Sequence, residues 1–276
     1  MSSNQRPNAI SWTLITVTFN SADQLAKYWS HPVPGDVEWI VVDNGSTDDS
    51  VITAGRLGAR VIAVGRNLGF SAANNRGLKV ARGGYVAFVN PDVTVVFSDL
   101  PELAKRIDHR GGLVSPQLVN DDGSRQPNGR GAPLIAHKVI NRLSGGSQMR
   151  NQYLLFAGDT EERFVFWTIG AVVAGSAETF ARLGGWNERF FLYYEDKDIA
   201  IRAWRDGLAV VLCGQFQWVH GWARETTEFR LMPWIREIAS LTKFYSLYPE
   251  LLFGGPWMRR RNNSAAVHSG EVLSID

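Results

Sequence analysis

Apolar, strand-like runs alternate with polar, helix-forming stretches over the first 119 residues of this chain. The runs span Thr13–Phe19, Val37–Asp43, Arg60–Val64, Tyr85–Asn90 and Gly112–Val119. Strands that alternate with helices build a mostly parallel sheet, because a parallel connection needs a crossover long enough for a helix. The sequence therefore predicts an α/β fold, with a doubly wound, mostly parallel sheet flanked by helices and strands that point toward one common edge.

Beyond residue 119 the pattern changes. Residues 120–162 are rich in Gly, Pro, Asn and Arg with little periodicity, and irregular inserts of this length are usually functional or mobile. Order returns with the apolar run Phe164–Ala174, a short helix at Ser176–Leu183 and a helix at Glu195–Asp206 that begins with acidic side chains. An aromatic, amphipathic segment at 229–248 follows, and the polar tail is expected to be disordered.

Composition narrows the class of protein. With 276 residues, 45% of them apolar, the chain is long enough for one large α/β domain or two modest ones. Its 29 basic and 27 acidic residues leave a net charge of +2, which excludes a polycationic nucleic-acid binder. Residues 1–8 lack the apolar core of a secretory signal, and no run approaches the ~20 apolar residues of a membrane span. We therefore expect a cytoplasmic protein in which the single cysteine, Cys213, is a buried, inert thiol.

Polar motifs follow the strand-like runs, at the edge where open α/β sheets bind ligands. Asp43 precedes Asn44-Gly45-Ser46, where its carboxylate would accept a hydrogen bond from the imide N–H of a nucleobase; the same residues also make an ordinary turn. The loop Gly65–Phe70 allows close approach of a ribose or phosphate. Its alternative is a helix cap with a glycine packing site, and Arg66 is either a phosphate ligand or a surface cation.

The motif Asn90-Pro91-Asp92 follows another apolar run. Its proline stops the strand, which aims the Asp92 carboxylate off the edge of the sheet. Mg²⁺ or Mn²⁺ prefers such an oxygen ligand and is usually completed by substrate phosphates and water. The alternative is a strand-terminating Asx-Pro turn.

Two further motifs carry titratable side chains. Glu195-Asp196 begins a helix, where acidic residues are stabilising without any catalytic role, but the preceding aromatic run 190–194 would desolvate a carboxylate and favour a general base. His220 lies between Trp218 and Trp222, and a lone histidine in aromatic surroundings is more often packed in the core than bound to a metal.

Together these residues resemble the family 2 glycosyltransferases, which are nucleotide-sugar-dependent inverting enzymes with the GT-A fold, and in particular the bacterial rhamnosyltransferases of cell-envelope and O-antigen assembly. The similarity runs from about Trp12 to Trp222. It rests on Val17–Asn20, Val42–Asp48, Asn67–Phe70, Asn90–Asp92, Gly184–Phe191 and Tyr194–Asp196.

The resemblance implies roles for individual residues. The catalytic pair is Asp196, as the base, with Glu195, and the metal ligands are Asp92 and His220. The acceptor contacts are Gly170, Trp186 and Tyr194. The residues implied to bind the nucleotide are Thr18, Asn20, Asp43, Ser46, Arg66, Asn67, Gly69, Asn74 and Asn90.

It also implies a domain plan and an activity. Residues 1–225 are expected to form the GT-A catalytic domain, with a Rossmann-like nucleotide-sugar-binding half at about 10–119 and an acceptor-binding half at 120–225. Residues 226–261 would be a C-terminal helical segment and 262–276 a disordered tail. The implied reaction is inverting transfer of L-rhamnose from dTDP-rhamnose, or of another dTDP- or UDP-linked hexose, with Mg²⁺ or Mn²⁺. The acceptor would be a hydroxyl of a glycan or polyprenyl-linked glycan in cell-surface polysaccharide synthesis.

The sequence departs from the family pattern at two places. Many members have an Asp-x-Asp cluster where this chain has Asn90-Pro91-Asp92, so the metal would depend heavily on the diphosphate. Relatives often carry paired arginines where this chain has Ala174–Ala177, which puts the acceptor contacts in doubt.

Other functions remain to be weighed. An NAD-dependent oxidoreductase is disfavoured because no Gly-x-Gly-x-x-Gly follows the first strand. A nucleotide-sugar-binding or scaffold protein that keeps the fold without turnover is the main alternative. The C-terminal segment, which ends in Trp257 and three arginines, either lies on an anionic membrane surface at the inner face of the cell membrane, packs on the core or forms a homodimer contact.

Overall fold

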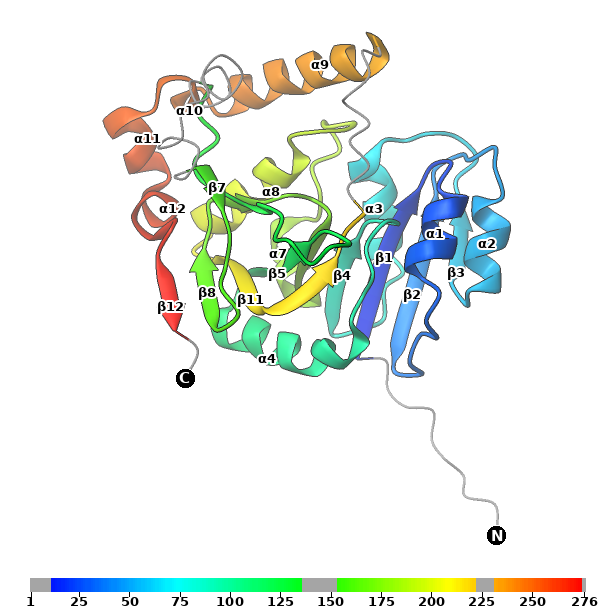
Figure 1. Cartoon of the computed structure of the whole chain (residues 1–276). Coiled ribbons are helices and arrows are strands. Elements are labelled where there is room, and N and C mark those ends of the chain that lie inside the picture. The colour runs from blue at the N-terminus through cyan, green and yellow to red at the C-terminus, as the bar shows by residue number, and fades with distance from the viewer. Residues whose placement is uncertain (1–10, 136–152, 222–230, 275–276) are drawn as a thin grey trace.

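The computed structural model describes residues 11–135, 153–221 and 231–274 (Figure 1). Parts of three predicted segments lie outside these residues: the polar N-terminus, the middle of the irregular insert and the beginning of the C-terminal segment. Nine strands form the large sheet, in the order β12-β8-β11-β5-β10-β4-β1-β2-β3. They are β1 (Trp12–Thr18), β2 (Val37–Asp43), β3 (Arg60–Ala63), β4 (Tyr85–Val89), β5 (Leu113–Val119), β8 (Glu161–Phe164), β10 (Val172–Ser176), β11 (Val210–Val219) and β12 (Val272–Ser274).

The sheet is mostly parallel, as predicted. β1 pairs in parallel with β2 and β4, β2 with β3, and β5 with β11. β10 is antiparallel to both of its neighbours, and so is β8. Every strand of this sheet except β8 and β10 therefore runs in one direction. The five apolar runs predicted up to residue 119 are β1 to β5, each within one residue of its predicted ends.

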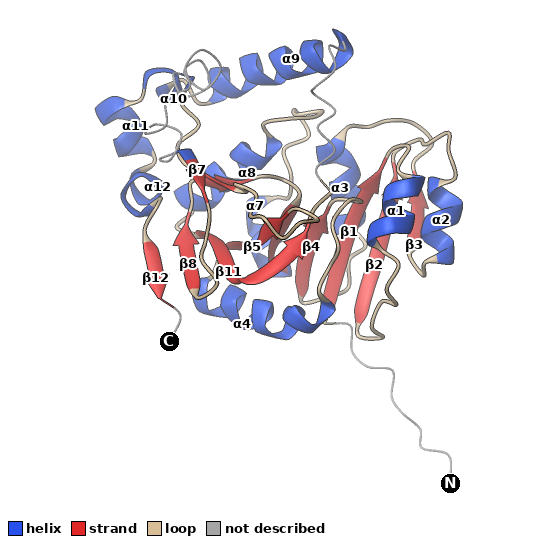
Figure 2. Cartoon of the chain, in the orientation of Figure 1, coloured by secondary structure: helices blue, strands red, loops and turns tan. Residues whose placement is uncertain are grey.

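Helices cover both faces of the sheet, which confirms the doubly wound arrangement (Figure 2). Successive residues of a strand point to opposite faces, so Leu14 belongs to one buried cluster and Ile15 to the other. The Leu14 cluster packs under α1 (Ala22–Tyr28), α2 (Ser50–Arg56) and α4 (Leu100–Arg110), which follows the 3-10 turn η1 (Phe97–Asp99). The Ile15 cluster packs under α3 (Phe70–Leu78), α7 (Ala177–Leu183) and α8 (Glu195–Arg205).

The predicted apolar run Phe164–Ala174 is not one strand. It is divided among β8, β9 (Trp167–Thr168) and β10, because the chain crosses here from the large sheet to a second, three-stranded sheet in the order β7-β6-β9. The other two strands of that sheet, β6 (Gly129–Arg130) and β7 (Leu154–Leu155), come from the insert that was expected to be irregular.

The C-terminal residues contain α9 (Leu231–Leu247), α10 (Glu250–Phe253), α11 (Gly255–Arg261) and α12 (Asn263–His268). Phe244 and Tyr248 of this part are buried in the Ile15 cluster, so α9 packs on the core. The expectation of a disordered tail is wrong for residues 263–274, because α12 is followed by β12, which pairs with β8. Cys213 is buried and free, as expected, and none of the described helices has the length and apolarity to cross a bilayer.

Candidate active site

Thr18 and Asp43 end the neighbouring parallel strands β1 and β2, whose register pairs them directly. The Thr18 hydroxyl donates a hydrogen bond to Asp43 Oδ1 at 3.4 Å. The same carboxylate accepts hydrogen bonds from the backbone N–H groups of Gly45 and Ser46, at 3.2 Å each. Asp43 therefore closes its own turn, the structural role that the sequence left open, and it does so at the ligand-binding edge of the sheet.

Asn20 joins the turn after β1 to the turn after β2. Its N–H donates to Ser46 Oγ at 2.9 Å, and its side-chain oxygen accepts from the Thr47 N–H at 2.8 Å. Asn20 has a φ of +54°, a left-handed conformation that asparagine tolerates better than most residues. The structure thus brings together four predicted nucleotide residues: Thr18, Asn20, Asp43 and Ser46.

An amide network continues this edge toward α3. Asn44 Nδ2 donates to Asn67 Oδ1 at 2.9 Å, and that oxygen also accepts from the Gly69 N–H at 2.9 Å. Gly69 has a φ of +85°, and a Cβ atom there would lie 2.5 Å from the Phe191 carbonyl oxygen. The close approach predicted at Gly69 is therefore to the protein backbone of a distant loop.

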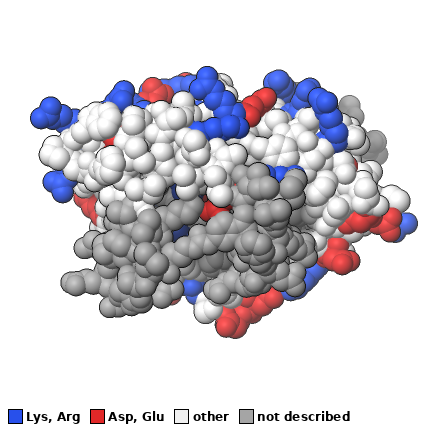
Figure 3. All heavy atoms as spheres, turned by 90° about the horizontal axis from the view of Figure 1, so that it is seen from above, with Lys and Arg blue, Asp and Glu red and all other residues white. Residues whose placement is uncertain are grey.

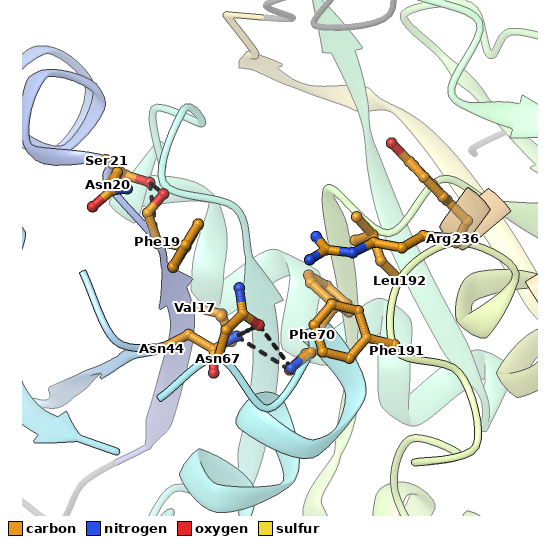
Figure 4. Close-up of a pocket in the computed structure, with 12 residues that line it drawn as sticks. Val17, Phe19, Asn20, Ser21, Asn44, Asn67, Phe70, Phe191, Leu192 and Arg236 are labelled. Atoms are coloured by element: carbon orange, nitrogen blue, oxygen red, sulfur yellow. Dashed lines mark hydrogen bonds between the residues drawn. The ribbon is translucent and has the colours of Figure 1, made fainter. Parts of the chain in front are cut away.

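A cavity of about 460 Å³ opens beside this network, a size suited to a small-molecule ligand (Figure 4). Its near side comes from the loops after β1, β2 and β3, and its far side from the segment 191–193 and from α9. In Figure 4, Asn44 and Asn67 face Phe191 and Arg236 across this space. The lining residues are Val17, Phe19, Asn20, Ser21, Asn44, Asn67, Gly69, Phe70, Phe191, Leu192, Tyr193 and Arg236.

Six of the nine predicted nucleotide residues are not among the residues that line the cavity. Thr18, Asp43 and Ser46 belong to the hydrogen-bonded turns described above, and the other three are Arg66, Asn74 and Asn90. Arg66 is exposed at the surface. Asn74 is buried and its side chain donates to the Phe70 carbonyl at 3.1 Å within α3. Asn90 lies in the turn after β4, and its N–H donates to the Ala171 carbonyl at 2.9 Å. The Asn74 bond is a structural contact of its side chain, whereas the Asn90 bond is made by its backbone. Contacts of Arg66, Asn74 and Asn90 with the nucleotide therefore stay predictions.

Asp92 and His220, the predicted metal ligands, lie together. His220 Nε2 is 3.5 Å from Asp92 Oδ1. The backbone maintains this proximity, because the Gly221 N–H donates to the Asp92 carbonyl at 2.8 Å and Val93 forms an antiparallel bridge with His220. His220 is buried, but beside a carboxylate instead of in a purely aromatic setting.

Gln126 determines which nitrogen of His220 carries the proton. Gln126 Nε2 donates to the His220 carbonyl and to Asn120 Oδ1, at 2.8 Å each, which leaves its Oε1 as an acceptor 2.7 Å from His220 Nδ1. Nδ1 must then be the protonated nitrogen, and the Nε2 lone pair faces Asp92. Burial lowers the pKa of His220, although the Asp92 charge opposes this shift.

A divalent cation fits between these two acceptors. One carboxylate oxygen and one neutral imidazole nitrogen are suitable ligands for Mn²⁺, and the oxygen for Mg²⁺. The described residues contain no group of three or more acidic, histidine or cysteine side chains that would complete a site. A cation here would therefore depend on ligands from a substrate diphosphate and from water.

Glu195 and Asp196 start α8 but have different surroundings. The Glu195 carboxyl is buried, its Oε2 has no hydrogen-bond partner, and burial together with the nearby Asp196 charge raises its pKa to about 8. The Asp196 side chain is 15% exposed and accepts a hydrogen bond from the Lys197 N–H at 2.8 Å. Glu195 is thus protonated at neutral pH, whereas Asp196 is the accessible carboxylate.

Two cations lie near Asp196, although the arginine pair of relatives is absent. Lys197 Nζ is 3.4 Å from Asp196 Oδ1 and 3.9 Å from the centre of the Trp167 ring. Arg130, on β6, is buried with its guanidinium 5.8 Å from the same ring, and burial lowers its pKa. The insert therefore supplies a basic group near Asp196 that its irregular sequence did not indicate.

Gly170 lies between Phe70 and Asp196. A Cβ atom on Gly170 would lie 3.7 Å from Asp196 Cβ and 3.8 Å from the Phe70 ring, so these two side chains approach one another across this glycine. Phe70 lines the cavity. The Asp196 side chain therefore lies close to the wall that Phe70 forms for the cavity.

The two aromatic residues predicted to contact an acceptor are core residues instead. Trp186 is 2% exposed and packs edge-on against Phe70 and Phe88. Tyr194 is 4% exposed and its ring packs against Phe244. Of the predicted acceptor residues, only Gly170 lies at the site. The sequence pattern did not separate these roles because aromatic residues are common both in cores and in sugar sites.

Sequence reasoning also missed residues that the structure places at the site. Gln126 belongs to the irregular insert, and Phe191 and Arg236 come from segments interpreted for other reasons. No local pattern marks them, because their partners lie far away in the chain. Gln126, for example, is 94 residues from His220.

Comparison with known proteins gives a consistent result. Residues 13–166 match the model of the protein family described as glycosyl transferase family 2. The chain is 26% identical over 235 residues to an N-acetylglucosaminyl-diphospho-decaprenol L-rhamnosyltransferase of Mycobacterium tuberculosis, which covers 77% of this chain and 76% of that protein. It is 24% identical over 225 residues to a low-salt glycan biosynthesis hexosyltransferase of Haloferax volcanii, covering 79% and 69%.

Solved structures share the fold. TarS of S. aureus superposes with a TM-score of 0.54 at 17% identity, over 76% of this chain and 60% of that one. A Pyrobaculum calidifontis mannosyltransferase, in complex with GDP-Man and Mn²⁺, has a TM-score of 0.55 at 17% identity, over 96% and 77%. These neighbours have the GT-A fold, which the described sheet and helices also show.

Proposed function

Because the chain belongs to glycosyl transferase family 2, we propose that it transfers a hexose from a nucleoside diphosphate donor to a hydroxyl of a glycan or lipid-linked glycan. The observation that carries this proposal is the close approach, at Gly170, of the cavity-lining Phe70 and Asp196. A donor in the cavity would place its sugar toward a carboxylate that is accessible enough to remove a proton from an acceptor.

The proposed step is a single displacement at the anomeric carbon. Asp196 takes the proton of the acceptor hydroxyl, whose oxygen forms the new bond to that carbon. The bond from the carbon to the phosphate oxygen breaks, and its electron pair leaves with the nucleoside diphosphate. Attack opposite to the leaving group inverts the anomeric configuration. Mg²⁺ or Mn²⁺ held by Asp92 and His220 would offset the charge that develops on the departing diphosphate.

Asp196, and not Glu195, is the proposed base. A general base must be unprotonated and within reach of the proton that it removes. Glu195 meets neither condition at neutral pH, because its carboxyl is buried and its pKa is raised to about 8. Glu195 instead serves as a buried neutral group beneath Asp196.

We further propose L-rhamnose carried by dTDP, or another dTDP- or UDP-linked hexose, as the donor. Support comes from the M. tuberculosis relative, which its name describes as an L-rhamnosyltransferase acting on N-acetylglucosaminyl-diphospho-decaprenol. A panel of nucleotide sugars tested for protection against thermal unfolding would identify the donor, because a ligand at 100 times its Kd stabilises by about 2.7 kcal/mol. Protection by a donor together with release of its diphosphate on addition of acceptor is expected. Protection without any turnover would favour a non-catalytic nucleotide-sugar-binding protein.

The C-terminal surface is proposed to contact an anionic membrane, where a lipid-linked acceptor would reside. Phe253 is 90% exposed at the end of α10 and Trp257 is 51% exposed on α11, next to the exposed Arg259–Arg261. Seen from above, other described Lys and Arg side chains are scattered among acidic and uncharged ones (Figure 3). Aromatic residues beside arginines suit the interface of an anionic bilayer.

Vesicle sedimentation tests this contact. The wild-type chain should sediment with vesicles that contain phosphatidylglycerol, and the double variant Phe253→Ser/Trp257→Ser should not. Val267→Ser, at a position 64% exposed on α12, is the matched control and should behave like wild type. The alternative outcome is that the wild type fails to sediment with these vesicles and forms a dimer in sedimentation velocity. If the double variant abolishes that dimer, the surface is a homodimer contact.

A further inference from the structure

Arg236 brings a positive charge to the donor cavity from a helix outside the matched family region. It lies on α9, whereas the family model matches residues 13–166. The sequence pattern predicted only that this part of the chain is amphipathic. Figure 4 shows its side chain extending from α9 toward the space in front of Asn44 and Asn67.

Arg236 is the only charged residue among the twelve that line the cavity. The others are uncharged, with amide, hydroxyl, aromatic and aliphatic groups that suit a nucleoside but cannot offset the negative charge of a diphosphate. An anion that leaves water for a cavity of this kind needs a charged hydrogen-bond partner. The arginine fork matches phosphate oxygens in a bidentate geometry, which a lysine cannot do.

The guanidinium is held against an aromatic ring. Its central carbon lies 4.7 Å from the centre of the Phe191 ring. Stacking uses the flat face of an arginine and leaves its N–H edge available for a ligand. Phe191 is itself fixed, because its carbonyl accepts a hydrogen bond from the Phe70 N–H at 2.7 Å, at the beginning of α3.

The helix that carries Arg236 is fastened to the acceptor half. Ser240 Oγ donates to the Leu192 carbonyl at 2.7 Å, and Lys243 Nζ donates to the Arg189 carbonyl at 3.1 Å. One turn further, the Tyr248 hydroxyl lies 2.8 Å from Asp198 Oδ1 on α8. These contacts join α9 to the loop 189–194 and Tyr248, the residue after α9, to α8, and so give Arg236 a defined position over the cavity.

We propose that Arg236 binds the diphosphate of the nucleotide donor and stabilises it as the leaving group. The inference rests on the proposed transfer reaction and adds a residue to it. As the bond between the anomeric carbon and the phosphate oxygen breaks, the electron pair moves to that oxygen, and Arg236 donates N–H hydrogen bonds to the phosphate oxygens. Phe191 is the positioning residue that holds the guanidinium.

The test compares the binding of a nucleoside with that of its diphosphate by calorimetry, using uridine and UDP, or thymidine and dTDP, in Mg²⁺ buffer. Arg236→Ala should weaken diphosphate binding by ~10–100-fold, the range expected for loss of a charge-assisted hydrogen bond, and leave the weak nucleoside binding unchanged. Arg236→Lys should recover only part of the loss. Phe191→Leu should give an intermediate loss in diphosphate affinity, with the nucleoside again unaffected.

Arg56→Ala is the matched control, because it removes an exposed arginine of the same charge on α2, away from the cavity. Equal diphosphate affinity in Arg236→Ala and wild type would overturn the assignment of Arg236. An equal loss for nucleoside and diphosphate would also overturn it, since that result indicates a change in cavity shape. If the wild type binds none of these diphosphates, the proposed function itself fails. This outcome is distinct from a failure of the Arg236 assignment, in which the wild type still binds.

Discussion

His220 Nδ1 lies 2.7 Å from Gln126 Oε1, and this buried contact makes Nε2 the nitrogen that faces Asp92. Gln126 is thus a partner behind a predicted metal ligand, of the kind that orients an imidazole and sets its tautomer. The contact joins the insert between β5 and β8 to the end of β11. It explains how a histidine with an unpromising local sequence obtains a defined orientation toward a carboxylate.

Gln126→Leu should weaken Mn²⁺ binding in the presence of a nucleoside diphosphate by ~10–100-fold, because the ring would lose its orienting acceptor. Electron paramagnetic resonance of free Mn²⁺ measures this directly, without activity. Gln217→Leu removes an exposed amide from the same region and should keep wild-type affinity. Unaltered Mn²⁺ affinity in a folded Gln126→Leu protein would refute the orienting role.

Asp196→Asn should lower kcat for transfer by ~10²–10⁴-fold, the usual contribution of a general base, with nucleotide affinity nearly unchanged. Glu195→Gln is the matched control, since it makes the same chemical change at the adjacent, buried carboxyl. It should retain most activity at neutral pH because Glu195 is already protonated there. The reverse ranking in a steady-state assay would assign the base to Glu195.

Glu195 should make the stability of the fold depend on pH. Its pKa is about 8 in the folded protein and near the ordinary 4.5 in the unfolded chain. Between these values the folded state keeps a proton that the unfolded chain has released, so the free energy of unfolding falls as pH rises, by at most ~1.4 kcal/mol per pH unit. Below the unfolded pKa both states are protonated and there is no loss.

Glu195→Gln should therefore flatten this decline. Denaturant unfolding at pH 5, 6.5 and 8 should show that the advantage of the variant over wild type grows with pH. An advantage that stays constant or shrinks across these values would contradict the raised pKa of the Glu195 carboxyl.

Gly69→Ala should disturb both stability and nucleotide binding. The new methyl group would lie 2.5 Å from the Phe191 carbonyl oxygen, on a residue with a φ of +85°. Gly65→Ala is a matched control, because Gly65 also has a positive φ, +72°, but has open space around its Cβ position. Backbone strain of about 1–2 kcal/mol is expected for both. Only Gly69→Ala should lose UDP or dTDP affinity in calorimetry; equal losses in the two variants would show that strain alone is responsible.

The fold of the first half was readable from the sequence for a physical reason. A buried parallel strand needs a short continuous apolar run, and the crossover helix needs a polar stretch with its own period, so β1 to β5 appear at their predicted places. The motifs after β1, β2 and β4 could be assigned to one edge because parallel strands end on the same side. Proximity of Asp92 to His220 followed from the family resemblance, and the structure supplies the distance.

Local sequence is less informative wherever a role depends on what a side chain meets from far away. Trp186 and Tyr194 looked like ligand contacts, but Trp186 is buried against Phe70 and Phe88, and Tyr194 against Phe244. The C-terminal tail was expected to be disordered, yet β12 pairs with β8 at the edge of the large sheet.

The sequence by itself determined the order of strands and helices and the chemistry available at their ends, because both depend on residues that are close in the chain. Only the tertiary structure decided which groups share the site. Gln126 reaches His220, Gly170 separates Phe70 from Asp196, and Arg236 faces Asn67, through packing between elements many residues apart. Such contacts are set by how buried surfaces fit together, and no local pattern encodes them.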